Sequence, residues 1–140
     1  MEEPKEVVIL YQDEFITVRY DPQHKFIYHT IHKPVEGWPL RNALLAGTEA
    51  LKKYKVTKWL SDDRLNAGLS DEDRDWGMEN WNVQTIEAGW KYWAMVVPTE
   101  VVAAGSMIPT MNAWYELGLR MMVFATLDEA IKWLDSVDAD

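Results

Sequence analysis

The sequence contains no cysteine, which excludes disulfide bonds, thiolate nucleophiles and cysteine-ligated metal sites. It also lacks any apolar run near the roughly 20 residues of a membrane-spanning helix, so we expect no integral membrane protein. The first five residues, Met-Glu-Glu-Pro-Lys, are acidic and do not form the pattern of a signal peptide. We therefore expect a cytoplasmic protein.

Lysine and arginine are scarce in the second half of the chain. Residues 1–70 contain ten basic and ten acidic side chains, whereas residues 71–140 contain four and thirteen, so the net charge of −9 lies entirely in the second half. Without a basic stripe to neutralise phosphates, we expect no binding to nucleic acid. A surface polarised in this way serves either solubility or the steering of a basic partner.

The spacing of apolar residues predicts an α/β fold. Alternating side chains over residues 15–20 and 25–32, on either side of a turn at residues 21–24, predict a β-hairpin after a short strand at residues 7–11. Further strands are expected at residues 56–60, 90–97 and 119–124. Helices are expected over about residues 38–54, 70–87 and 107–117 and from Thr126 onward, with a loop or short turn at residues 100–105.

Local signals mark the ends of these helices. Ser70 and Thr126 precede acidic residues and are expected as N-caps, and Ser106 is expected to cap the helix whose first turn contains Pro109. The resulting order, β-β-β-α-β-α-β-α-β-α, predicts a mixed sheet with helices packed on it. We find no linker or repeat, and expect a single domain over residues 1–140.

Three segments together resemble a known family. They are Trp-Leu-Ser-Asp-Asp-Arg at residues 59–64, Ala-Gly-Trp-Lys-Tyr-Trp-Ala at residues 88–94, and the ending at residues 124–134. This pattern resembles the SpoIIAA-like group of the STAS superfamily (sulphate-transporter and anti-sigma-factor-antagonist domains). The resemblance implies a STAS-like fold and a protein-interaction or small-ligand module. The segment from Ser61 to Ser70 departs from the family's usual Ser-Ser-Gly arrangement, so we expect no phosphorylation switch there.

Ser61, Asp62, Asp63 and Arg64 form the strongest polar constellation in the sequence. They follow the C-terminal end of an expected parallel strand, where ligands bind in open α/β sheets. The carboxylates suit a cation or a general base, and Arg64 suits an anion. Alternatively, Asp62 bonds loop amides and Arg64 pairs with an acid of the next helix.

Apolar side chains suggest a second candidate site. Trp76 and Trp81 share the acidic helix but lie about 140° apart at 3.6 residues per turn, so one of them is expected to face a groove or a partner. Residues 101–115 carry more apolar side chains than one buried stripe needs. We expect them to form a lid over a cavity, a dimer contact, a membrane-touching patch or a deeply buried helix. The candidate surface comprises Trp76, Trp81, Val101, Val102, Met107, Ile108, Met111 and Trp114.

These observations favour a non-enzymatic regulatory or protein-interaction module, with a protein partner or a second copy bound through the apolar surface. A carrier or sensor of a small apolar, lipid-like ligand, acting at a membrane surface, is the alternative. A hydrolase-like activity at Asp62 and Arg64 ranks third. We expect no cofactor and no metal site, because His24 lies in a turn and His29 and His32 point to opposite faces of a strand.

Overall fold

The chain begins with three antiparallel strands. In the computed structural model, which describes residues 4–65 and 70–137, β1 (Val8–Gln12) pairs with β2 (Ile16–Asp21), and β2 pairs with β3 (Phe26–Ile31). The β2–β3 turn includes Lys25 at a φ of 58°. Alternation along β3 places Ile27, His29 and Ile31 on one face of the sheet, as the sequence predicts.

Three parallel strands extend this hairpin into a six-stranded mixed sheet. They are β4 (Lys58–Asp62), β5 (Tyr92–Val96) and β6 (Arg120–Phe124), and the spatial order follows the sequence from β1 to β6. The expected class, α/β with a mixed sheet and helices packed on it, is therefore confirmed. Among the described residues, no helix combines the length and the apolar content needed to cross a membrane.

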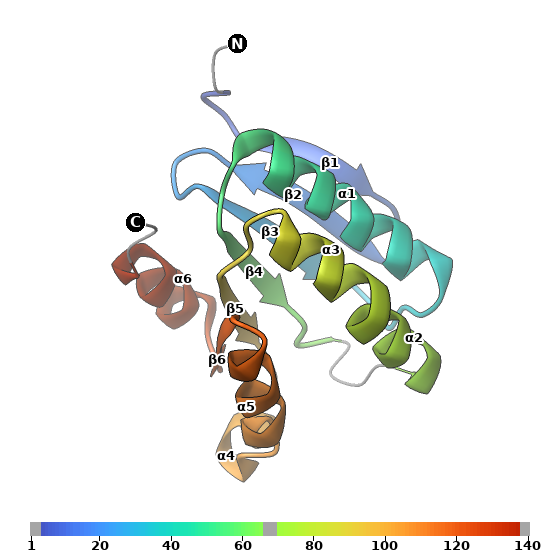
Figure 1. Cartoon of the computed structure of the whole chain (residues 1–140), viewed down its shortest axis with the longest axis vertical. Helices are drawn as coiled ribbons and strands as arrows, with labels where there is room; N and C mark the ends of the chain where they lie inside the picture. Colours follow the sequence, from blue (N-terminus) through green and yellow to red (C-terminus); the bar gives the residue numbers. More distant parts are fainter. Residues whose placement is uncertain (1–3, 66–69, 138–140) are drawn as a thin grey trace.

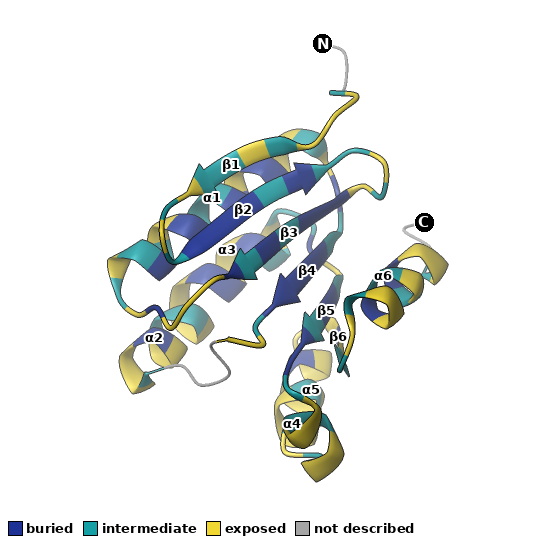
Figure 2. Ribbon diagram, turned by 180° about the vertical axis from the view of Figure 1, so that it is seen from behind, coloured by how far each residue is buried: buried dark blue, intermediate teal, exposed yellow. Residues whose placement is uncertain are grey.

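The helices form two unequal layers (Figure 1). The connections between the parallel strands cover one face, which we call the helix face, and α6 (Leu127–Ser136) packs on the opposite face against β4–β6. On that opposite face, no helix of the described chain lies over β1–β3 (Figure 2). The helix-face elements are α1 (Trp38–Tyr54), α2 (Asp71–Trp76), the π-helical turn η1 (Gly77–Trp81), α3 (Asn82–Glu87), α4 (Thr99–Ala104) and α5 (Ile108–Glu116).

Five tryptophans fill the core beneath the helix face. Neighbouring indole rings lie 4.9–5.8 Å apart between centroids, mostly in edge-on or tilted arrangements, which are the preferred geometries of aromatic pairs. The five are Trp59, Trp81, Trp90, Trp93 and Trp114. Gly47 of α1 lets the helix approach this cluster, because a Cβ at that position would overlap the Trp59 ring.

Helix ends agree with the sequence in most places. The Ser70 and Thr126 hydroxyls accept hydrogen bonds from the backbone N–H groups of Asp73 and Glu129, so both expected N-caps are confirmed. The expectation of a loop at residues 100–105 is wrong, because residues 99–104 form α4, which ends at Gly105 in the left-handed conformation. Ser106 does not cap α5, whose N-cap is Met107.

Candidate functional site

The sheet divides the polar constellation at the end of β4 between its two faces. Ser61 and Asp63 lie on the helix face, where they meet Trp93 and His29. Asp62 lies on the opposite face and bonds Arg64. The structure therefore does not bring the four residues together as one site, because successive side chains of a strand point to opposite sides.

His29 links the two ends of a buried polar chain on the helix face. The indole Nε1–H of Trp59 donates to Nδ1 of His29 over 3.0 Å, and Nε2 of His29 lies 2.8 Å from Oδ1 of Asp63. The indole N–H only donates, so Nδ1 accepts and the imidazole proton lies on Nε2. The Trp93 indole likewise donates to Oγ of Ser61 over 2.7 Å.

Ser61, His29 and Asp63 lie close together but do not have the geometry of a nucleophilic triad. Ser61 and His29 are register partners on neighbouring strands. Both imidazole nitrogens are already bonded, to Trp59 and to Asp63, and Ser61 is fully buried. A general base must reach the nucleophile's proton with a free nitrogen. The arrangement instead gives hydrogen-bond partners to the indole N–H groups of Trp59 and Trp93. Alternation in β3 was the sequence signal that placed His29 on this face.

Asp62 and Arg64 form a two-pronged ion pair on the opposite face. Nε of Arg64 donates to Oδ1 of Asp62 over 2.9 Å, and Nη2 donates to Oδ2 over 2.7 Å. Hydrogen bonding to this carboxylate and its negative charge raise the pKa of Arg64. Arg64 therefore pairs with Asp62 rather than with an acid of the following helix. Both Asp62 oxygens accept from Arg64, so this carboxylate is held in an ion pair.

A cavity of about 400 Å³ opens beside this ion pair. It is lined by Thr30, Ile31, His32, Asp62, Arg64 and Leu65. Nε2 of His32 lies 2.7 Å from Oγ1 of Thr17. His32 therefore bonds on the face of the sheet that carries Asp62, whereas His29 is buried on the helix face. Of the segment from Ser61 to Ser70, which departs from the Ser-Ser-Gly pattern, residues 66–69 lie outside the described residues.

A second cavity, of about 580 Å³, lies where α1 and α2 begin. It is lined by Glu36, Gly37, Arg41 and residues 70–73. The buried carboxylate of Asp73 accepts from Nε of Arg41 over 3.0 Å and from the Gly37 amide over 2.9 Å. These bonds tie the start of α2 to the start of α1. In residues 4–65 and 70–137, no group of three His, Asp or Glu side chains is placed to hold a metal ion.

The apolar candidate residues divide between core and surface. Trp81 and Trp114 are each only 5% exposed and belong to the tryptophan core, so neither lines a surface. Trp76 is half-buried and packs against the same core. The expected angle between Trp76 and Trp81 is wrong, because η1 has π-helical i→i+5 hydrogen bonding, with Asn82 N–H donating to Gly77 O. With this wider turn, Trp81 lies in the tryptophan core and Trp76 packs against it.

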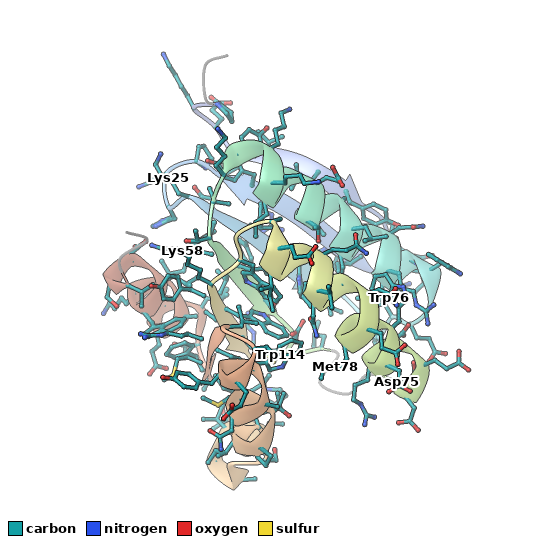
Figure 3. The ribbon with its side chains drawn as sticks, in the orientation of Figure 1. Lys25, Lys58, Asp75, Trp76, Met78 and Trp114 are labelled. Carbon is teal, nitrogen blue, oxygen red and sulfur yellow. The ribbon has the colours of Figure 1, made fainter. Side chains whose placement is uncertain are left out.

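Residues of α5 face two ways. Met107, Met111 and Trp114, spaced four and three residues apart, pack inward on the core (Figure 3 shows Trp114). Ile108, Tyr115 and Leu117 are 56%, 65% and 52% exposed, and we call these three residues the outer α5 surface. Val101 and Val102 of α4 are half-buried. Of the residues expected in the surface, Ile108 alone is largely exposed.

Comparisons with protein-family models, curated proteins and solved structures found no match for this chain. The fold and the two candidate regions define an α/β domain with a mixed sheet, a tryptophan-rich core and an exposed apolar helix surface.

Proposed function

We propose that this protein is a protein-interaction module of the SpoIIAA-like STAS type, and that its outer α5 surface binds a partner protein. The relation to that family rests on the segments at residues 59–64, 88–94 and 124–134, and on an element order in which a β-hairpin precedes alternating helices and parallel strands. The interaction role rests on α5. Trp114 alone is buried among its nine residues, while Ile108 and Tyr115 point away from the core.

The charge around α5 indicates the chemistry of the partner. Residues 99–118 contain Glu100 and Glu116 but no lysine or arginine, and both glutamates are exposed. The α2–η1 segment, which carries Asp75, Trp76 and Met78 (Figure 3), is also mostly acidic on its exposed side. An apolar surface flanked by the exposed Glu100 and Glu116 complements a basic amphipathic helix. The same acidic charge opposes contact with an anionic membrane surface.

The alternative, a carrier of an apolar ligand, has less support from the packing. Such a ligand needs space between residues 101–115 and the sheet. The Trp114 ring occupies that position, in edge contact with Trp93 at 5.8 Å between centroids. Neither of the two cavities described above is lined by residues 101–115.

Binding of a synthetic amphipathic peptide tests the proposal. A lysine–leucine helical peptide is titrated against the protein by fluorescence anisotropy, with a glutamate–leucine peptide of equal length as the charge control. We expect only the basic peptide to bind, more weakly at high salt. Ile108→Asp with Tyr115→Asp should weaken binding by about tenfold or more, which corresponds to about 1.4 kcal/mol.

The matched control is Val83→Asp with Ile9→Asp, two exposed apolar residues on other elements. This variant should bind the basic peptide as the unmodified protein does. Equal binding of both peptides, or unchanged binding by the Ile108/Tyr115 variant, would overturn the proposal. A lipid that copurifies in native mass spectrometry and competes with the peptide would favour the carrier function instead.

A further inference from the structure

The two edges of the sheet differ in how they are protected. At one edge, β1 has a register irregularity between Ile9 and Tyr11, of the kind that discourages pairing with another strand. At the other edge, β6 keeps an unbroken register with β5 over all five residues. Its sequence, Arg-Met-Met-Val-Phe, contains no proline and one charge. β6 therefore has neither a register irregularity nor a proline to block edge pairing.

The backbone of β6 presents hydrogen-bonding groups outward. The Arg120 N–H donates to Lys91 O over 2.9 Å, and Phe124 O accepts from Val97 N–H over 3.0 Å. Lys91 and Val97 directly precede and follow β5, so Arg120 and Phe124 point these backbone groups toward β5. Backbone groups of successive residues alternate in direction. The N–H and C=O groups of Met121 and Val123 therefore point away from β5. Within the described part of the chain, β6 pairs only with β5.

Apolar side chains accompany this edge. Met122 is 38% exposed on the α6 face, and Leu117, just before the strand, belongs to the outer α5 surface. Helices α5 and α6 pack on opposite faces of the sheet beside β6 (Figure 1). An edge of this kind is a template for an added strand. Apolar side chains on both faces of the sheet beside β6 would become buried when the strand is added.

We propose that β6 pairs antiparallel with β6 of a second copy of this chain, so that two sheets join into one around a twofold axis. A pairing centred on Met122 sets Met121 opposite Val123 of the second copy, which matches the residues whose backbone groups point outward. The same register sets Arg120 opposite Phe124 of the second copy, a favourable cation–aromatic pair.

The charges at the two ends of β6 favour the antiparallel direction. Arg120 begins the strand, and the acidic residues Asp128 and Glu129 follow its end in the first turn of α6. Antiparallel pairing brings the basic end of one copy to the acidic end of the other, whereas parallel pairing brings like charges together. Because each copy carries a net charge of −9, salt should strengthen the dimer by screening the overall repulsion.

Sedimentation velocity and amide hydrogen exchange test this proposal on the whole chain. We expect a dimer that dissociates on dilution and is stabilised by added salt, the opposite salt dependence to that of the basic peptide. In the dimer, the Met121 and Val123 amides should exchange slowly. In the diluted monomer these two amides should exchange at least about tenfold faster, while the Met122 amide, which faces β5, stays protected.

Val123→Pro supplies a variant that removes an outward N–H without breaking the β5–β6 ladder. It should remain folded by circular dichroism and sediment as a monomer at all concentrations. The Ile108→Asp/Tyr115→Asp variant should still dimerise, which separates this proposal from the docking function of α5. A concentration-independent monomer, fast exchange at Met121 and Val123 at high concentration, or a dimer retained by folded Val123→Pro would each overturn it. Should Val123→Pro unfold, the exchange rates of the Met121 and Val123 amides in the unmodified protein decide whether β6 pairs with a second copy.

Discussion

The indole of Trp59 donates a hydrogen bond to Nδ1 of His29, and this contact connects the tryptophan core to the end of β4. His29 in turn lies 2.8 Å from the Asp63 carboxylate, which sits at the carboxyl end of the strand. Aromatic packing and polar pairing therefore meet at one buried imidazole. Loss of the His29 imidazole would leave the Trp59 N–H and an Asp63 oxygen without their hydrogen-bond partner.

Replacement of His29 should destabilise the domain strongly. We expect His29→Ala to lower the free energy of unfolding by roughly 2–4 kcal/mol, since it leaves a buried donor unpaired and opens a cavity. Urea denaturation measures this change. The control is His24→Ala, because the half-buried His24 pairs with the exposed Asp135 and should cost under about 1 kcal/mol. Equal losses in the two variants would contradict this role for His29. Nitrogen NMR should also find the His29 proton on Nε2.

Gly47 should be required for the packing of Trp59. Alanine normally stabilises a helix interior relative to glycine by about 0.5–1 kcal/mol. At Gly47 the new Cβ would overlap the Trp59 ring, which is fully buried in the tryptophan core. We therefore expect Gly47→Ala to destabilise the protein by about 1–3 kcal/mol in chemical denaturation.

Gly77 provides the matched control for this change. It is also helical, with a φ of −59°, and a Cβ there would meet no atom within 4 Å. Gly77→Ala should leave the stability unchanged or raise it slightly. A stabilised Gly47→Ala variant would show that α1 does not approach the sheet as closely as described.

Asp13 should make stability depend on pH in the acidic range. Burial alone raises the pKa of Asp13, but hydrogen bonds from the Tyr11 hydroxyl and the backbone amides of Ile16 and Phe15 outweigh it, so the pKa lies below its ordinary value. A carboxylate whose pKa is lowered by folding stabilises the native state above its unfolded pKa of about 3.9. This contribution is lost as the pH falls through the folded pKa.

Asp13→Asn isolates this effect because the amide resembles the protonated acid. At neutral pH we expect the variant to be less stable by about 0.5–1 kcal/mol, a modest value for a partly exposed group. Thermal denaturation across pH should show the difference vanish below the folded pKa. Tyr11→Phe should bring the folded pKa of Asp13 closer to its unfolded value, so that the loss is smaller and is complete at a higher pH. A difference that persists unchanged at the lowest pH would refute the assignment.

Local patterns in the sequence predicted most of the fold. Alternation fixed which side of β3 each residue faces, and the hydroxyls of Ser70 and Thr126 identified two helix starts, because both signals depend on neighbouring residues alone. The sequence signals for α4 were weak. Its N-cap is Pro98, which offers no capping side chain, and its apolar residues gave no clear stripe.

The candidate sites were harder to predict because they depend on tertiary geometry. Ser61 and Asp62 are adjacent in sequence, yet the sheet separates their side chains. The positions of Trp76 and Trp81 required knowledge of one π-helical turn, which changes the angle between two residues five apart. Nothing in the sequence distinguished the inward residues of α5 from the outward ones, since both sides carry apolar side chains.

The two sides of α5 should respond differently to the same charge. Met111 is half-buried and packs on the tryptophan core, whereas Ile108 is 56% exposed. Met111→Asp places a carboxylate against apolar rings and should lower the free energy of unfolding by roughly 2 kcal/mol or more. Ile108→Asp should change it by no more than about 0.5 kcal/mol, because its side chain already meets water. Urea denaturation of both variants measures the difference. A Met111→Asp variant as stable as Ile108→Asp would show that α5 stands clear of the core, and both faces would then be open to a partner.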